Sequence, residues 1–142
     1  MMSSVEGNLV AARLEDGEDF LEKIGELADK HRIKSGVFLG CIGMWRDTEL
    51  CFFDLKLKKY FRTSFKKPLE LVSLQGNIGK KDNGERVVHC HVVLGDTKYR
   101  LVGGHFSKAT VHVCNEVFIL RLKKVKIRRR LEKTGLYGMS VA

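Results

Sequence analysis

Apolar residues recur with two different periods along the chain, and the change of period separates one helix from many strands. Between Phe20 and His31 they fall three and four residues apart, which places them on one face of a helix. This face consists of Phe20, Leu21, Ile24, Leu27, Ala28 and His31. Acidic residues precede it and basic residues end it, as the helix dipole favours. We therefore predict a helix that begins near Glu18 or Asp19.

Elsewhere, short apolar runs are separated by turn-forming residues, which predicts strands. The expected strands cover residues 8–14, 35–45, 48–55, 59–65, 69–79, 86–95, 99–107 and 109–122. Turns are expected at Arg46-Asp47, at Asn83-Gly84 and at Asp96-Thr97-Lys98, and Pro68 marks a loop. One early helix followed by many strands predicts an α+β fold, a mainly antiparallel β-sheet with one major helix packed against it.

The length of 142 residues is typical of one domain. We expect a single domain over residues 1–142, with a core at about 8–120 and a basic C-terminal strand and tail at 121–142. No apolar run is long enough to cross a bilayer, and the first residues lack the pattern of a secretory signal, so a cytoplasmic location without membrane contact is expected. The four cysteines lie in apolar surroundings and are expected to be reduced.

Three of the five histidines fall in the most strand-like segment of the chain. His89 and His91 are two residues apart, so on a strand their imidazoles point to the same face. A hairpin through Asp96-Thr97 would bring His105 alongside them, and Gly103-Gly104 would permit a bulge that re-aims His105. Three imidazoles with one open position are typical of a reactive zinc site. We predict that His89, His91 and His105 bind a divalent transition metal, with zinc the expected ion.

Alternatives to a metal site remain open at this point. His-x-His also occurs by chance, and histidines serve as structural partners within sheets. His112 is a weaker candidate on the following strand. Glu116 could be a fourth ligand, a partner of an imidazole, a general base, or an ordinary ion-paired glutamate.

The net charge of +9 favours anionic partners. Eight basic residues lie between Arg121 and Lys133 against one glutamate. As a strand, this stretch would present Lys124, Lys126, Arg128 and Arg130 as a row of cations. A second basic stretch, 56–67, has aromatic residues interleaved. Such patches can neutralise nucleic-acid phosphates, or they can protect an exposed sheet edge from aggregation.

Together these segments resemble a known family. The order "GEDFLEKIGELADKH", "KSGVFLGCIG", "CFFD", "LELVSLQGNI", "VHCHVVLGD", "LVGGHF" and "NEVFI" is similar to the plant and prokaryote conserved (PPC) domain, over about residues 8–120. The resemblance implies an α+β fold and a homotrimer. It implies DNA binding for the prokaryotic members, and it places His89, His91 and His105 on the family's histidine positions. The Arg-Gly-Arg-Pro peptide with which plant members enter the minor groove does not occur in this sequence.

Three functions follow as hypotheses. The first is a trimeric metal-binding protein with a nucleic-acid or regulatory role. The second is a zinc-dependent hydrolase or another metalloenzyme that uses the three histidines. The third is a nucleic-acid binder in which the histidines are structural.

Overall fold

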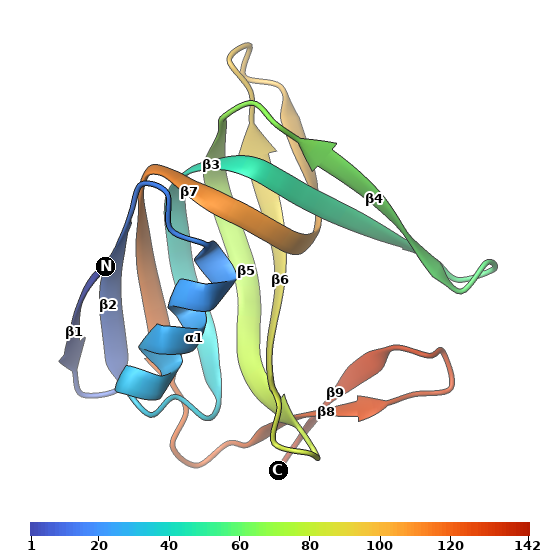
Figure 1. The fold of residues 1–142 in the computed structure, drawn as a ribbon. Coiled ribbons are helices and arrows are strands. Elements are labelled where there is room, and N and C mark those ends of the chain that lie inside the picture. The colour runs from blue at the N-terminus through green and yellow to red at the C-terminus, as the bar shows by residue number, and fades with distance from the viewer.

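A computed structural model describes all residues from 1 to 142 and contains one helix and nine strands (Figure 1). The elements are β1 (Met2–Glu6), β2 (Leu9–Glu15), α1 (Phe20–Lys30), β3 (Gly36–Asp54), β4 (Lys59–Phe65), β5 (Leu69–Lys81), β6 (Arg86–Gly95), β7 (Leu101–Arg121), β8 (Ile127–Leu131) and β9 (Tyr137–Val141).

All nine strands belong to one sheet, and four of them close into a ring. In this ring β3 pairs with β5, β5 with β6, β6 with β7, and β7 with β3, always antiparallel. The remaining strands extend from the ring: β1 and β2 from β7, β4 from β3, and the β8–β9 hairpin from β5. The pairing of β5 with β8 is the single parallel contact. The predicted α+β class with a mainly antiparallel sheet is therefore confirmed.

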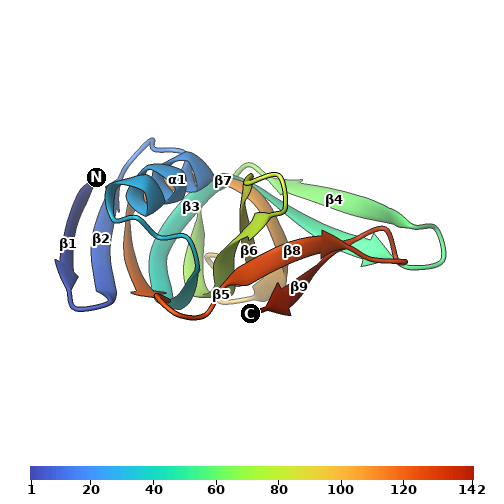
Figure 2. The same ribbon diagram turned by 90° about the horizontal axis from the view of Figure 1, so that it is seen from below.

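The helix packs its apolar face on the sheet, as its periodicity predicts (Figures 1 and 2). Asp19 caps the N-terminus by accepting a 2.9 Å hydrogen bond from the backbone N–H of Glu22. Phe20, in the first turn, makes edge-to-face contacts with Trp45, at 4.9 Å between ring centroids, and with Phe106, at 5.5 Å. No helix in the structure has both the length and the apolar character that crossing a bilayer requires.

Two strands are longer than the sequence predicts. The expected turn at Arg46-Asp47 is wrong, because β3 runs on to Asp54 through an irregularity at which Asp47 has a positive φ of 49°. Strand β7 joins the two expected strands 99–107 and 109–122 into one. Bulges supply the bends without ending the strands, and a local sequence signal does not distinguish the two cases. Strands β1 and β9 were not predicted.

The C-terminal basic stretch forms a shorter strand than expected. Strand β8 begins at Ile127, so Lys124 and Lys126 precede it, and the predicted row of four cations is wrong. Within β8, Ile127 and Arg129 are buried while Arg130 is exposed. Arg129 is therefore the one charged residue of this strand that faces inward.

Candidate metal centre

The hairpin of β6 and β7 brings the three predicted histidines together. His91 on β6 is the register partner of His105 on β7, and His89 lies two residues from His91 on the same face. The connecting turn is fixed by Asp96, whose carboxylate accepts hydrogen bonds from the backbone N–H groups of Lys98, at 2.8 Å, and Arg100, at 3.0 Å. Backbone pairing therefore sets the spacing of the three imidazoles.

The three rings form a compact triangle. The ring centroids are 5.3 Å apart for His89 and His91, 5.0 Å for His89 and His105, and 5.2 Å for His91 and His105. One ring nitrogen from each histidine lies within 4.8 Å of the other two, and no carboxylate or thiol joins the group. A tetrahedral zinc ion holds its nitrogen ligands about 3.4 Å apart, so modest ring rotations would close the triangle on an ion. The donor set thus fits a divalent transition metal.

Glycines allow the strands around the histidines to approach closely. A Cβ atom on Gly76 of β5 would lie 2.2 Å from the carbonyl oxygen of His89, and one on Gly103 of β7 would lie 2.7 Å from the carbonyl oxygen of Val92. The predicted bulge at Gly103-Gly104 is wrong, because the register from His91↔His105 to Gly95↔Leu101 is continuous. These glycines permit close strand contact and do not re-aim His105.

Burial favours the neutral form of His89 and of His105. It is the main cause that lowers the pKa of His89 to about 4, with smaller contributions from the charges of Arg129, His105 and His91. The pKa of His105 is lowered by burial, then by His91, Arg129 and Arg62. Neutral imidazole is the form that binds a metal, so the environment of His89 and His105 favours ligation.

A groove of about 640 Å³ lies over His89 and His105, between strands β4 to β7 on one side and the β8–β9 hairpin on the other. The ring of Tyr60 lies 5.5 Å from that of His105. Arg129 lines the groove and donates a hydrogen bond from Nη2 to Oδ1 of Asn77. Sequence reasoning did not assign Arg129, Asn77 or Tyr60 to the site. The sequence did indicate that Arg129 faces inward, because on a strand it lies on the same face as the apolar Ile127.

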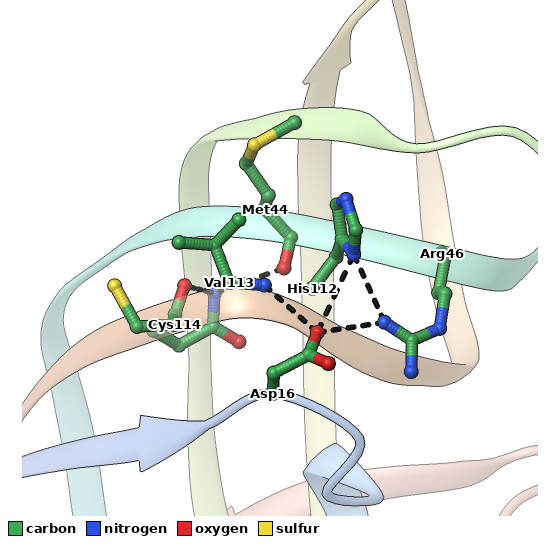
Figure 3. Close-up of polar contacts among 7 residues, drawn as sticks. Asp16, Met44, Arg46, His112, Val113 and Cys114 are labelled. Atoms are coloured by element: carbon green, nitrogen blue, oxygen red, sulfur yellow. Dashed lines mark hydrogen bonds and ion pairs between the residues drawn. The ribbon is translucent and has the colours of Figure 1, made fainter.

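The other candidates lie elsewhere. Figure 3 shows His112 in a polar cluster at a bulge of β7, where Arg46 Nη1 is 2.9 Å from His112 Nδ1 and 2.7 Å from Asp16 Oδ1. Asp16 also accepts a 3.0 Å hydrogen bond from the backbone N–H of Val113, whose φ is 65°. This cluster holds the turn before α1 against the bulge.

Glu116 and the cysteines contribute nothing to the histidine group. Glu116 lies opposite Arg13 and Ile42 and makes no ion pair, so it is neither a fourth ligand nor the ion-paired glutamate expected. All four cysteines are free thiols, as predicted. Burial raises the pKa of Cys41 and raises that of Cys90 to about 12, which keeps both protonated and unreactive.

Comparison with known proteins identifies the family of the chain. The sequence profile described as the Plants and Prokaryotes Conserved (PCC) domain matches residues 1–123. The chain belongs to this family. No curated protein sequence matches this PCC protein.

Solved structures share the fold over nearly the whole length. A plant- and prokaryote-conserved (PPC) protein from Pyrococcus horikoshii is 33% identical, with a TM-score of 0.87 over 98% of this chain and 94% of that one. A metal-containing protein from Archaeoglobus fulgidus is 30% identical, with a TM-score of 0.85 over 99% of each chain. A Bacteroides thetaiotaomicron protein named a "putative dna binding protein" is 23% identical, with a TM-score of 0.88 over 98% of this chain and 96% of that one. This last likeness concerns the fold alone.

A second feature of this PCC domain is a basic cavity of about 470 Å³ beside the start of β8. It has no acidic residue in its lining. Its seven cations are Arg32, Lys34, Lys80, Arg121, Lys123, Lys126 and Arg128. The C-terminal basic stretch thus joins cations from the end of α1 and from β5.

Proposed function

We propose that this PCC protein binds a divalent transition metal, zinc first among them, through His89, His91 and His105. The observation that carries the proposal is the convergence of three imidazoles whose ring nitrogens lie within 4.8 Å of one another. The similar Archaeoglobus fulgidus protein contains a metal. Three histidine ligands leave a coordination position for water or another ligand, as in zinc sites that react rather than only support a fold.

Each histidine contributes in a different setting. His89 and His105 line the groove, whereas His91 is exposed. A fourth ligand would therefore approach from the groove, where Tyr60, Asn77 and Arg129 lie. A three-histidine zinc ion supplies Lewis acidity and lowers the pKa of bound water to about 7.

Cobalt titration of chelator-treated protein tests the proposal. Co²⁺ prefers the same ligands as zinc and, unlike zinc, absorbs visible light. We expect absorption that saturates at one cobalt per chain in the wild type and that is lost in His105→Ala. Unchanged absorption in His105→Ala would contradict the ligand set.

A zinc-dependent hydrolase is the alternative, and the groove favours it. Besides the histidines and Arg129, three titratable side chains line the groove and could move a proton: Tyr60, Glu132 and Tyr137. Metal-loaded protein should then hydrolyse activated carboxylic or phosphate esters, and His105→Ala should abolish this activity. Absence of turnover across such esters would leave metal binding without catalysis.

A nucleic-acid role is supported by the basic cavity. Seven cations without an acidic neighbour suit phosphate groups. Affinity for duplex DNA should fall steeply with salt, and Lys123→Gln with Lys126→Gln should reduce the slope of log K against log salt by about 2. A salt-independent affinity, or no binding at low salt, would exclude this role.

We also propose that residues 1–142 form one domain that assembles as a homotrimer. One cluster of 24 buried residues links the helix with the strands. The PPC resemblance implies the trimer, and exposed apolar side chains support self-association: Leu39 and Ile42 on β3, Val72 on β5 and Phe118 on β7 are each at least 42% exposed.

A further inference from the structure

Arg129 is a buried cation without a counter-ion. Arg129 is only 4% exposed, yet no carboxylate lies within ion-pair distance of its guanidinium. Nη2 donates to the neutral amide oxygen of Asn77, and Nε has no hydrogen-bond partner. Burying a charge is unfavourable unless it is paired, so the folded chain alone leaves this guanidinium poorly compensated.

The acids near the groove do not neutralise Arg129. Glu132 lines the groove, but it is exposed, its side chain packs over Gly138, and it forms no ion pair. Glu49 is engaged by Arg62 and by the hydroxyl of Ser107. On the same strand, Arg130 faces solvent and pairs with Asp82 at 3.7 Å.

The histidine cluster adds to the imbalance. Arg129 is close enough to His89 and His105 for its charge to act on both. Three neutral imidazoles that hold a divalent ion carry two positive charges, and Arg129 adds a third. A small anion in the groove would balance this charge, since His89, His105 and Arg129 all line that groove.

We propose that the groove binds a small molecule with a carboxylate or phosphate group, one oxygen on the metal and another on Arg129. The proposal rests on the metal site proposed above. A guanidinium presents planar, paired donors that match such oxyanions. The groove volume of about 640 Å³ is suited to a metabolite-sized ligand. Arg129 is therefore a binding residue for the ligand and not a ligand of the metal.

The test uses cobalt-loaded protein titrated with inorganic phosphate and, separately, with acetate. An oxyanion that enters the cobalt coordination sphere changes its visible absorption. We expect a saturable change in the wild type, a dissociation constant at least tenfold higher in Arg129→Gln, and no change in Arg130→Gln, the matched control on the same strand. The anion that binds more tightly identifies the class of the natural ligand. An equal affinity in wild type and Arg129→Gln for both anions, or no spectral change in the wild type, would overturn the proposal.

Two further measurements separate this proposal from the metal site. Cobalt should still saturate at one ion per chain in Arg129→Gln, because Arg129 is not a metal ligand. If the wild type binds no cobalt, phosphate is titrated into the metal-free protein. Thermal stabilisation that depends on Arg129 would then support an anion site without a metal. Absence of stabilisation would overturn both the metal site and the anion site. If Arg129→Gln does not fold, Arg129→Lys keeps the charge but not the paired donors, and a weakened anion affinity is again expected.

Discussion

His91 and His105 are register partners on the antiparallel strands β6 and β7, with their ring centroids 5.2 Å apart. His89 reaches the same point because a strand turns alternate side chains to one face. A shift of one residue in the register of β6 and β7 would turn His105 to the other face of the sheet and separate it from His89 and His91. The metal site proposed here is therefore a property of strand register.

Gly76→Ala should weaken metal binding without changing any ligand. The new Cβ atom would lie 2.2 Å from the carbonyl oxygen of His89, so β6 must move away from β5 at the histidines. We expect a cobalt affinity at least tenfold lower and reduced thermal stability. Gly84→Ser in the adjacent turn would meet no atom within 4 Å, although its φ of 89° strains the backbone. That variant should lose stability but keep the metal affinity, and equal metal loss in both variants would contradict this reasoning.

Metal-free protein should lose stability as the pH falls from about 6.5 to about 4. The pKa of His89 is about 4 in the folded protein against an ordinary value of 6.5. As the pH falls, the unfolded chain therefore binds this proton before the folded protein does, and protonation stabilises the unfolded state. Carboxyl groups with lowered pKa values, such as Asp96, add to this loss at lower pH. Urea unfolding at several pH values should therefore show that the free energy of unfolding depends less steeply on pH in His89→Gln than in the wild type. An identical dependence in both proteins would show that His89 is not held neutral by burial.

Ile42→Lys should break the proposed trimer. Ile42 is 52% exposed and lies on β3 opposite Glu116 of β7, two register positions from the exposed Phe118, so an ammonium group there would be desolvated by a partner subunit. Light scattering coupled to size exclusion should give three chains per particle for the wild type and one for Ile42→Lys. Leu55→Lys, which changes a 63% exposed residue in the β3–β4 turn, should remain trimeric. A monomeric wild type would refute the assembly.

Asn115→Ala should destabilise the fold by about 2 to 4 kcal/mol. Asn115 is fully buried, accepts a 2.6 Å hydrogen bond from Nε1 of Trp45, and donates to the carbonyl oxygen of Cys114 at 2.9 Å. Truncation leaves the indole N–H unpaired and opens a cavity. Chemical denaturation should show this loss, whereas the exposed Asn8→Ala should stay within about 0.5 kcal/mol of the wild type.

Much of the site follows from local sequence signals. The period of two places His89 and His91 together, and the Asp96-Thr97-Lys98 turn predicts the hairpin that returns His105. The length and the bends of strands β3 and β7 cannot be predicted from local sequence, because their bulges depend on pairing with strands far along the chain. Arg129 could be placed on the apolar side of its strand, but its position at the groove depends on β8 joining β5, a contact between distant segments.

The metal content of purified protein tests the central claim most directly. Elemental mass spectrometry should find about one zinc or similar ion per chain in the wild type and in His112→Ala, whose histidine lies outside the cluster. His91→Ala should contain no stoichiometric metal while keeping the wild-type circular dichroism, because His91 is exposed and the substitution leaves its backbone pairing unchanged. A wild type purified without chelator that contains no metal, or a His91→Ala variant that keeps it, would contradict the proposed metal centre.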